Sequence, residues 1–172
     1  MRHHRIPVAI ALALVLVLWI RNIQSPTHVS DKAYDLLLST LLLHSVPEIS
    51  VDGLASAHFH ILDARSPREF AVSHIPGATW VGDDEFSVDR LASIDLQAPI
   101  AVYCSVGYRS ERIAVQLHRR GYPNVVNVYG GIFEWINMGH PVVTSDGTET
   151  DAIHAYSKLW GIWLTRGRRI YD

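Results

Sequence analysis

The sequence has only one cysteine, Cys104, among its 172 residues. A single cysteine excludes an internal disulfide bond, although it leaves open a bond between two chains and does not fix the redox compartment. An excess of positive charge is also absent, because the formal net charge is −2 and residues 22–172 hold 12 basic and 17 acidic side chains, or −5. This shortage of basic residues argues against a nucleic-acid partner.

A small-residue cleavage signal is missing after the long apolar run near the start of the chain. Residues 6–20 are uncharged and overwhelmingly apolar, and Arg2 and Arg5 precede them. We therefore expect an uncleaved signal anchor over residues 1–21, with a cleaved signal and a buried core helix as the alternatives. The run is slightly shorter than the roughly 17–25 residues of a spanning helix, but neighbouring residues extend it and Arg21 can snorkel to the interface. The flanking arginines favour a cytoplasmic N-terminus and an extracytoplasmic domain, periplasmic in a bacterium.

The rest of the chain predicts a single α/β domain. Residues 22–46 read as a linker and an amphipathic helix that Ser30 caps and that runs from residue 31 to about 44. Strands then alternate with helices, which calls for right-handed crossovers and a mostly parallel five-stranded sheet with helices on both faces. The expected strands are residues 48–51, 58–62, 78–81, 100–103 and 125–128, and helical patterns cover 52–57, 86–94 and 132–138 as well as the segments that begin at 67 and 110.

The segment around Cys104 indicates a nucleophile. Residues 100–103 form a short apolar run typical of a buried strand, and helical spacing begins near Ser110, so Cys104 lies where a strand leads into a helix. Backbone N–H groups in such a turn can bind an anion, and a thiol held there is expected to ionise readily. The alternative is a buried, inert cysteine. The Gly107 and Arg109 that follow within the same loop favour the reactive thiol.

Several motifs taken together resemble a single rhodanese domain, the sulfurtransferase fold. They are DARSPREF, SHIPGA, VYCSVGYRS, NVYGGIFEW and GHPV, in this order, within residues 47–143. Residues 144–172 form a C-terminal extension outside the resemblance, and Ser73 stands where the family often has glycine. The resemblance implies that Cys104 carries a persulfide during turnover. It also implies an active-site loop that consists of Ser105, Val106, Gly107, Tyr108 and Arg109.

The implied activity is the transfer of a sulfane sulfur. A small anionic donor such as thiosulfate would supply the sulfur, and cyanide, a thiol or a protein acceptor would remove it, with no cofactor and no metal. Arg109 and Arg112 are expected to attract the anionic donor. One alternative is a membrane-anchored persulfide carrier or recognition module with little free turnover. Another is a cysteine-based phosphatase or arsenate reductase, but such phosphatases resemble C-x5-R, and this sequence reads C-x4-R with Ser110 in the next position.

Three further groups of residues have more than one interpretation. Asp63, Arg65 and Glu69 form a possible polar site, and the resemblance favours a structural ion pair between Arg65 and Glu69. The spacing of the histidines at 58 and 60 suits a metal, but with no converging cysteine or carboxylate we interpret them as ordinary strand residues. The aromatic residues of the C-terminal extension predict an amphipathic, tryptophan-rich helix that covers the domain or, alternatively, lies on a membrane surface.

The anchor gives a direct prediction. The mature protein should keep its N-terminus and remain in the membrane fraction through an alkaline carbonate wash, because residues 6–20 are apolar and no cleavage signal follows them. Membrane fractionation followed by N-terminal sequencing measures both properties. Recovery of a soluble protein that begins after Arg21 would contradict the prediction.

Overall fold

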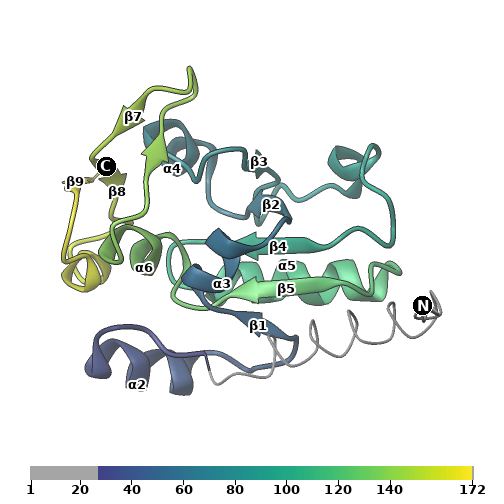
Figure 1. Cartoon of the computed structure of the whole chain (residues 1–172), viewed down its shortest axis with the longest axis horizontal. Helices are drawn as coiled ribbons and strands as arrows, with labels where there is room; N and C mark the ends of the chain where they lie inside the picture. The colour runs from purple at the N-terminus through teal and green to yellow at the C-terminus, as the bar shows by residue number, and fades with distance from the viewer. Residues whose placement is uncertain (1–26, 172) are drawn as a thin grey trace, which may run out of the picture.

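A computed structural model describes residues 27–171 of the chain (Figure 1). The predicted anchor at residues 1–21 lies outside this range. Within residues 27–171, none of the helices has the length and apolar character that crossing a membrane requires.

A five-stranded parallel sheet forms the centre of the domain, as the sequence predicts. The strand order is β1-β5-β4-β2-β3, so the strand that leads to Cys104 occupies the middle of the sheet (Figure 1). All four residues of this strand, β4, are buried, which explains its continuous apolar sequence. The strands are β1 (Glu48–Ile49), β2 (His60–Asp63), β3 (Thr79–Trp80), β4 (Ile100–Tyr103) and β5 (Val125–Val128).

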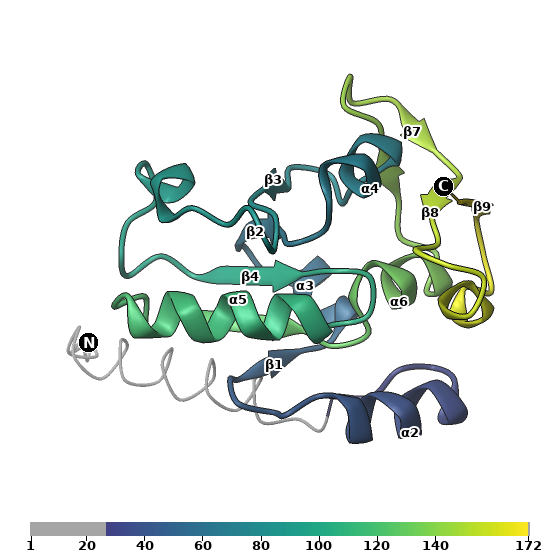
Figure 2. The ribbon, with the colours of Figure 1, turned by 180° about the vertical axis from the view of Figure 1, so that it is seen from behind.

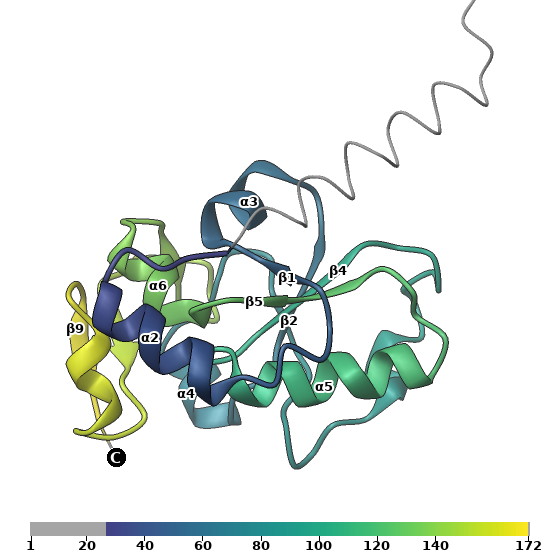
Figure 3. The same ribbon diagram turned by 90° about the horizontal axis from the view of Figure 1, so that it is seen from below.

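Helices cover both faces of the sheet. Successive side chains of β4 therefore point into two separate cores. Ile100 and Val102 pack with the residues of α5, whereas Ala101 and Tyr103 belong to the core that includes α3 and α6. Figure 3 shows α5 on one side of the sheet and α3 on the other. The helices are α3 (Val51–Ser56), α4 (Pro67–Val72), α5 (Tyr108–Arg119) and α6 (Gly131–Asn137).

The helical pattern at residues 86–94 forms only a short 3-10 helix, η1 (Val88–Leu91), so the prediction of a full helix there is wrong. Tertiary contacts of Arg90 explain the difference. Its guanidinium lies 4.1 Å from the ring centroid of Trp80 and donates a hydrogen bond to the Val81 carbonyl at 2.8 Å. These contacts hold the segment against β3, where local helical preference is too weak to decide the conformation.

The helix before the sheet, α2 (Lys32–Leu41), is shorter than the sequence predicts. Asp31 caps it, not Ser30, because the Asp31 carboxylate accepts hydrogen bonds from the N–H groups of Ala33 and Tyr34. Tyr34 is fully buried, and its hydroxyl donates to the Gly130 carbonyl at 3.0 Å. The helix therefore packs onto the domain next to the loop that precedes α6.

The C-terminal extension contains short strands, and the predicted amphipathic helix is wrong. Within residues 144–171, the only helix is the four-residue 3-10 helix η2 (Trp160–Trp163). It ends because Asn137 holds the chain that follows, donating to the Trp163 carbonyl at 2.8 Å and accepting from the Thr165 N–H at 2.8 Å. Trp163 stacks on Tyr34 with 5.2 Å between ring centroids. Figure 2 shows the extension beside α6. Its strands are β7 (Glu149–Thr150), β8 (Ala152–His154) and β9 (Arg168–Ile170), and β7 pairs with β6 (Val142–Val143), which precedes the extension.

The fold requires glycine at position 131. Gly131 has a φ of 56°, and a Cβ atom there would lie 2.4 Å from the Cys104 carbonyl oxygen and 2.7 Å from the Ser105 carbonyl carbon. Both contacts involve backbone, so a side chain would displace either α6 or the loop after β4. The first turn of α6 thus lies directly against the cysteine loop.

We predict that Gly131→Ala lowers the free energy of unfolding by about 3 kcal/mol, since it combines positive-φ strain with a backbone clash. Gly147→Ala is the matched control, because Gly147 has a φ of 83° but no atom within 4 Å of the added Cβ. This control should cost only about 1 kcal/mol, from the conformational term alone. Urea unfolding measures both values, and equal losses would show that the close approach contributes nothing.

Candidate active site

Cys104 follows β4 directly and lies in a tight loop before α5. Gly107, the residue before the helix, has a φ of 111°, a conformation that favours glycine. Its N–H donates to the Cys104 Sγ at 3.2 Å. The loop therefore turns a backbone donor toward the sulfur, although Cys104 is only 1% exposed.

Neighbouring elements hold the carbonyl groups of this loop. The N–H groups of Ile132 and Phe133, in the first turn of α6, donate to the carbonyls of Cys104 at 2.9 Å and Ser105 at 3.1 Å. The side-chain amide of Asn127, on β5, donates to the Gly107 carbonyl at 3.1 Å. Because these three carbonyls are hydrogen-bonded to β5 and α6, the sheet and α6 together set the position of the loop.

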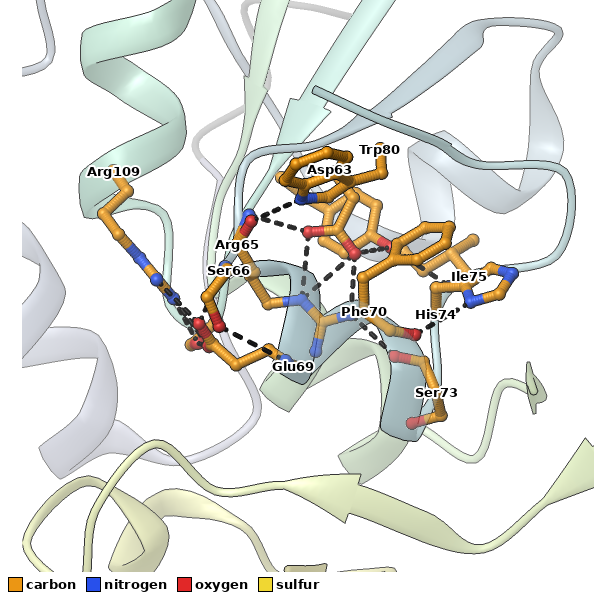
Figure 4. A network of polar contacts seen from close by, with 12 residues as sticks. Asp63, Arg65, Ser66, Glu69, Phe70, Ser73, His74, Ile75, Trp80 and Arg109 are labelled. Atoms are coloured by element: carbon orange, nitrogen blue, oxygen red, sulfur yellow. Dashed lines mark hydrogen bonds and ion pairs between the residues drawn. The ribbon is translucent and has the colours of Figure 1, made fainter. Parts of the chain in front are cut away.

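Glu69 of α4 and Arg109 of α5 form a bidentate ion pair beside the loop (Figure 4). The Arg109 nitrogens Nη1 and Nη2 lie 2.8 and 2.7 Å from the two Glu69 carboxylate oxygens. Ser105 joins them, because its hydroxyl donates to Glu69 at 2.9 Å and accepts from Arg109 at 2.9 Å. Three side chains from two helices and the loop thus form one closed polar cluster.

This cluster controls the ionisation of Glu69. Burial alone would raise the pKa of Glu69, but the hydrogen bonds and positive charge of Arg109, followed by the charge of Arg65, lower it to about 2. Ser66 adds a capping box, since its N–H donates to the Glu69 carboxylate at 3.0 Å. Glu69 is therefore a carboxylate at neutral pH, and it neutralises Arg109.

Arg65 has a different partner from the one that the sequence suggests. It is fully buried and pairs with Asp63, with 2.6 Å between Nη2 and Oδ2, so the predicted direct ion pair between Arg65 and Glu69 is wrong. The Tyr103 hydroxyl donates to the same carboxylate at 2.5 Å. Arg65 also donates to the Ser73 carbonyl at 2.7 Å (Figure 4). The resemblance favoured the wrong pair, because Arg65 meets the carboxylate of Asp63, two residues before it, and Arg109 of α5 occupies both oxygens of Glu69.

The cysteine loop opens into a pocket of about 920 Å³. The five loop residues expected to form the site occupy one region, but in different ways. Ser105 and Val106 are buried, Gly107 provides the N–H, Tyr108 is exposed and Arg109 lines the pocket with Cys104. His58 and His60, by contrast, are exposed at and just before the start of β2.

Sequence reasoning did not assign several other contributors to this pocket, and four of them lie outside the residues of the central domain. They come from segments that precede or follow the strands of the central sheet in the sequence. No local pattern marks them as neighbours of a cysteine. Only the tertiary fold brings them to the carboxyl end of β4, where ligands bind in parallel sheets. These residues are Leu41, His154, Tyr156 and Trp160.

Comparison with known proteins identifies the domain. The model of the Rhodanese-like domain family matches residues 48–138, which is more than half of the chain. This chain belongs to the rhodanese-like domain family. The match spans all five strands of the sheet and the helices α4, α5 and α6, so the family assignment includes the cysteine loop and the pair of Glu69 with Arg109.

Relatives of this rhodanese-like chain include named sulfurtransferases. It is 34% identical over 87 residues to the thiosulfate sulfurtransferase GlpE of Pseudomonas aeruginosa, a match that covers 51% of this chain and 77% of the relative. A sulfurtransferase of Allochromatium vinosum is 32% identical over 87 residues, covering 51% and 80%. A rhodanese-like domain from Anabaena, solved by NMR, superposes with a TM-score of 0.53 at 26% identity and covers 57% of this chain and 79% of that one.

The depressed pKa of Glu69 predicts how acid affects stability. Because its pKa falls from 4.5 to about 2 on folding, the carboxylate stabilises the protein above pH 4.5, and this stabilisation is lost as the pH falls toward 2. Glu69→Gln should therefore lower the free energy of unfolding at pH 7 by about 3 kcal/mol. It should also flatten the dependence of that free energy on pH between 4.5 and 2.

Urea titrations at several pH values test this prediction. The exposed Glu149 offers a matched control, and Glu149→Gln should leave both the stability and its pH profile nearly unchanged. Parallel pH profiles for Glu69→Gln and the wild type would show that the pair with Arg109 does not stabilise the fold.

Proposed function

We propose that this protein is a sulfurtransferase that moves a sulfane sulfur from a donor such as thiosulfate to a thiol or cyanide through a persulfide on Cys104. The observation that supports this most directly is the 3.2 Å contact between the Gly107 N–H and the Cys104 Sγ. A backbone donor directed at a sulfur stabilises negative charge on it both before attack and after transfer. The family membership and the names of the relatives agree with this chemistry.

The proposed reaction is a double displacement. The Cys104 thiolate attacks the outer sulfur of thiosulfate, a new sulfur–sulfur bond forms, and the bond inside thiosulfate breaks so that sulfite leaves with the electron pair. An acceptor thiolate or cyanide then attacks the outer sulfur of the persulfide. Cys104 leaves as the thiolate, which restores the starting state.

Arg109 serves this reaction by positioning the loop. Its guanidinium is held by both oxygens of Glu69 and by Ser105, so its charge is largely balanced within the protein. We therefore assign it to fixing the Ser105 end of the loop, and the attraction of donors expected from the sequence becomes a minor role. Arg112, whose side chain is 58% exposed, is the more accessible cation on the same helix.

Phosphate or arsenate chemistry fits the site poorly. A tetrahedral oxyanion needs an arginine that is free to bind two of its oxygens, and Arg109 already binds two oxygens of Glu69. The next residue, Ser110, is buried and donates to the Asn127 side chain at 2.7 Å, so it faces the sheet. These contacts favour sulfur transfer over the phosphatase alternative.

We also propose that the enzyme works at a membrane, with its domain on the extracytoplasmic side. The apolar residues 6–20 and the arginines around them support this location. The carrier alternative shares the anchor and the persulfide but not the turnover. Rapid steady-state formation of thiocyanate from thiosulfate and cyanide would distinguish the enzyme from such a carrier.

The first half-reaction gives a sharp prediction. Incubation of the full chain with thiosulfate should add one sulfur atom, and a reducing thiol should remove it, as intact mass spectrometry will show. Cys104→Ser should abolish the adduct, because the hydroxyl cannot replace the thiolate as the nucleophile. The variant should remain folded, since the two side chains have similar volumes.

Ser93→Ala tests the specificity of that result. Ser93 is exposed and does not line the pocket, so sulfur uptake should persist. An unchanged wild-type mass after thiosulfate, combined with Cys104-dependent hydrolysis of an aryl phosphate, would overturn the proposed function and favour the phosphatase.

A further inference from the structure

Part of the pocket wall comes from a segment outside the family match. The match ends at residue 138, yet Tyr156 and Trp160 line the pocket together with Cys104. The Tyr156 ring centroid lies 5.2 Å from the Arg109 guanidinium carbon. The C-terminal extension therefore belongs to the active site of this chain.

We define Tyr156 and Trp160 as the aromatic wall of the pocket. Several contacts hold this wall in place. The Ser73 hydroxyl, after α4, donates to the Ala152 carbonyl at 2.6 Å in a buried position. The Tyr156 N–H donates to the Nδ1 of His154 at 3.1 Å. Tyr156 also has a φ of 62°, which a non-glycine residue adopts only at a conformational cost. A tyrosine kept in that conformation at the mouth of the pocket points to a function for its ring.

The unbalanced charge of the pocket is negative. Each of the three arginines that line it is paired with a carboxylate, which balances its charge, although the side chain of Arg112 remains 58% exposed. Asp84 and Glu85 line the same pocket and are exposed, and within residues 27–171 neither forms an ion pair. The arginine pairs are Arg65 with Asp63 at 2.6 Å, Arg109 with Glu69 at 2.7 Å and Arg112 with Asp83 at 3.5 Å.

The size of the pocket also exceeds what a small donor needs. Its volume of about 920 Å³ falls at the upper end of the roughly 300–1,000 Å³ that drug-sized ligands occupy. An inorganic donor or cyanide fills a small fraction of that space. The remaining volume, between an aromatic wall and two free carboxylates, suits a ligand with an organic body and a positive charge.

We propose that Tyr156 and Trp160 bind the body of the sulfur acceptor, and that this acceptor is a cysteine thiol within a positively charged peptide segment. The proposal rests on the proposed sulfur transfer. The acceptor thiol loses its proton to solvent and attacks the outer sulfur of the Cys104 persulfide. A sulfur–sulfur bond forms on the peptide as the bond to Cys104 breaks, and Cys104 leaves as a thiolate.

Single-turnover transfer from the sulfur-loaded full chain tests the proposal with three acceptors. Two are short peptides with one cysteine, flanked by lysines in the first and by glutamates in the second, and the third is cyanide. The lysine peptide should react about tenfold faster than the glutamate peptide at low salt, and the difference should shrink as salt rises. Equal rates, or a faster glutamate peptide, would overturn the proposal.

Variants of the wall identify the residue responsible. Tyr156→Asn removes the ring but keeps a residue that tolerates positive φ, and it should lower kcat/KM for the lysine peptide about tenfold more than for cyanide. Tyr156→Phe keeps the ring and should behave like the wild type. Leu159→Asn is the matched control, because Leu159 is 73% exposed on the same segment and does not line the pocket. Equal losses for the peptide and cyanide would contradict a role in acceptor binding.

Charge variants test the other side of the pocket. The double change Asp84→Asn and Glu85→Gln should bring the rates of the two peptides together, whereas Glu149→Gln with Asp151→Asn, away from the pocket, should not.

Calorimetric binding of the lysine peptide with its cysteine replaced by serine separates this proposal from sulfur transfer. Peptide binding that depends on Tyr156, combined with no sulfur uptake, would support the aromatic wall as a binding site and contradict the proposed sulfur transfer. Absence of such binding would contradict the role of Tyr156 and Trp160 in acceptor binding.

Discussion

The bidentate ion pair between Glu69 and Arg109 is the contact on which the site depends. It connects α4 with α5 across the start of the cysteine loop and includes Ser105, the residue after the nucleophile. A charge pair with a buried carboxylate stabilises only if its hydrogen bonds are complete, and here both carboxylate oxygens accept from the arginine. The same contact that fixes the loop also removes a free cation from the pocket.

Most of the fold follows from the sequence, because apolar periodicity, glycines and prolines determine it locally. The run of residues 100–103 predicts β4 correctly, and Cys104 lies at the expected junction with α5. The partners of the charged residues could not be predicted. Arg65 meets Asp63, at the end of β2, and Arg109 meets Glu69. The second pair depends on how α4 and α5 come together in three dimensions.

The segments outside the family domain show a second limit of sequence reasoning. The aromatic pattern of the C-terminal extension predicted a helix, but contacts with Asn137 end η2 after four residues. The extension packs on α2 through the stack of Trp163 on Tyr34 and on the domain through the buried hydrogen bond from Ser73 to the Ala152 carbonyl. Its place beside the cysteine loop arises from tertiary contacts that no local pattern encodes. An extension of a common domain can thus alter the active site without altering the catalytic loop.

We infer that Glu69 and Arg109 act as one unit that positions the cysteine loop. A double-mutant cycle on the rate of sulfur uptake from thiosulfate tests it most directly, with Glu69→Gln, Arg109→Gln and both changes together. Because either single change breaks the pair, the double variant should be no slower than Arg109→Gln alone. If the two losses instead multiply, the residues act independently, and Arg109 serves the donor without help from Glu69.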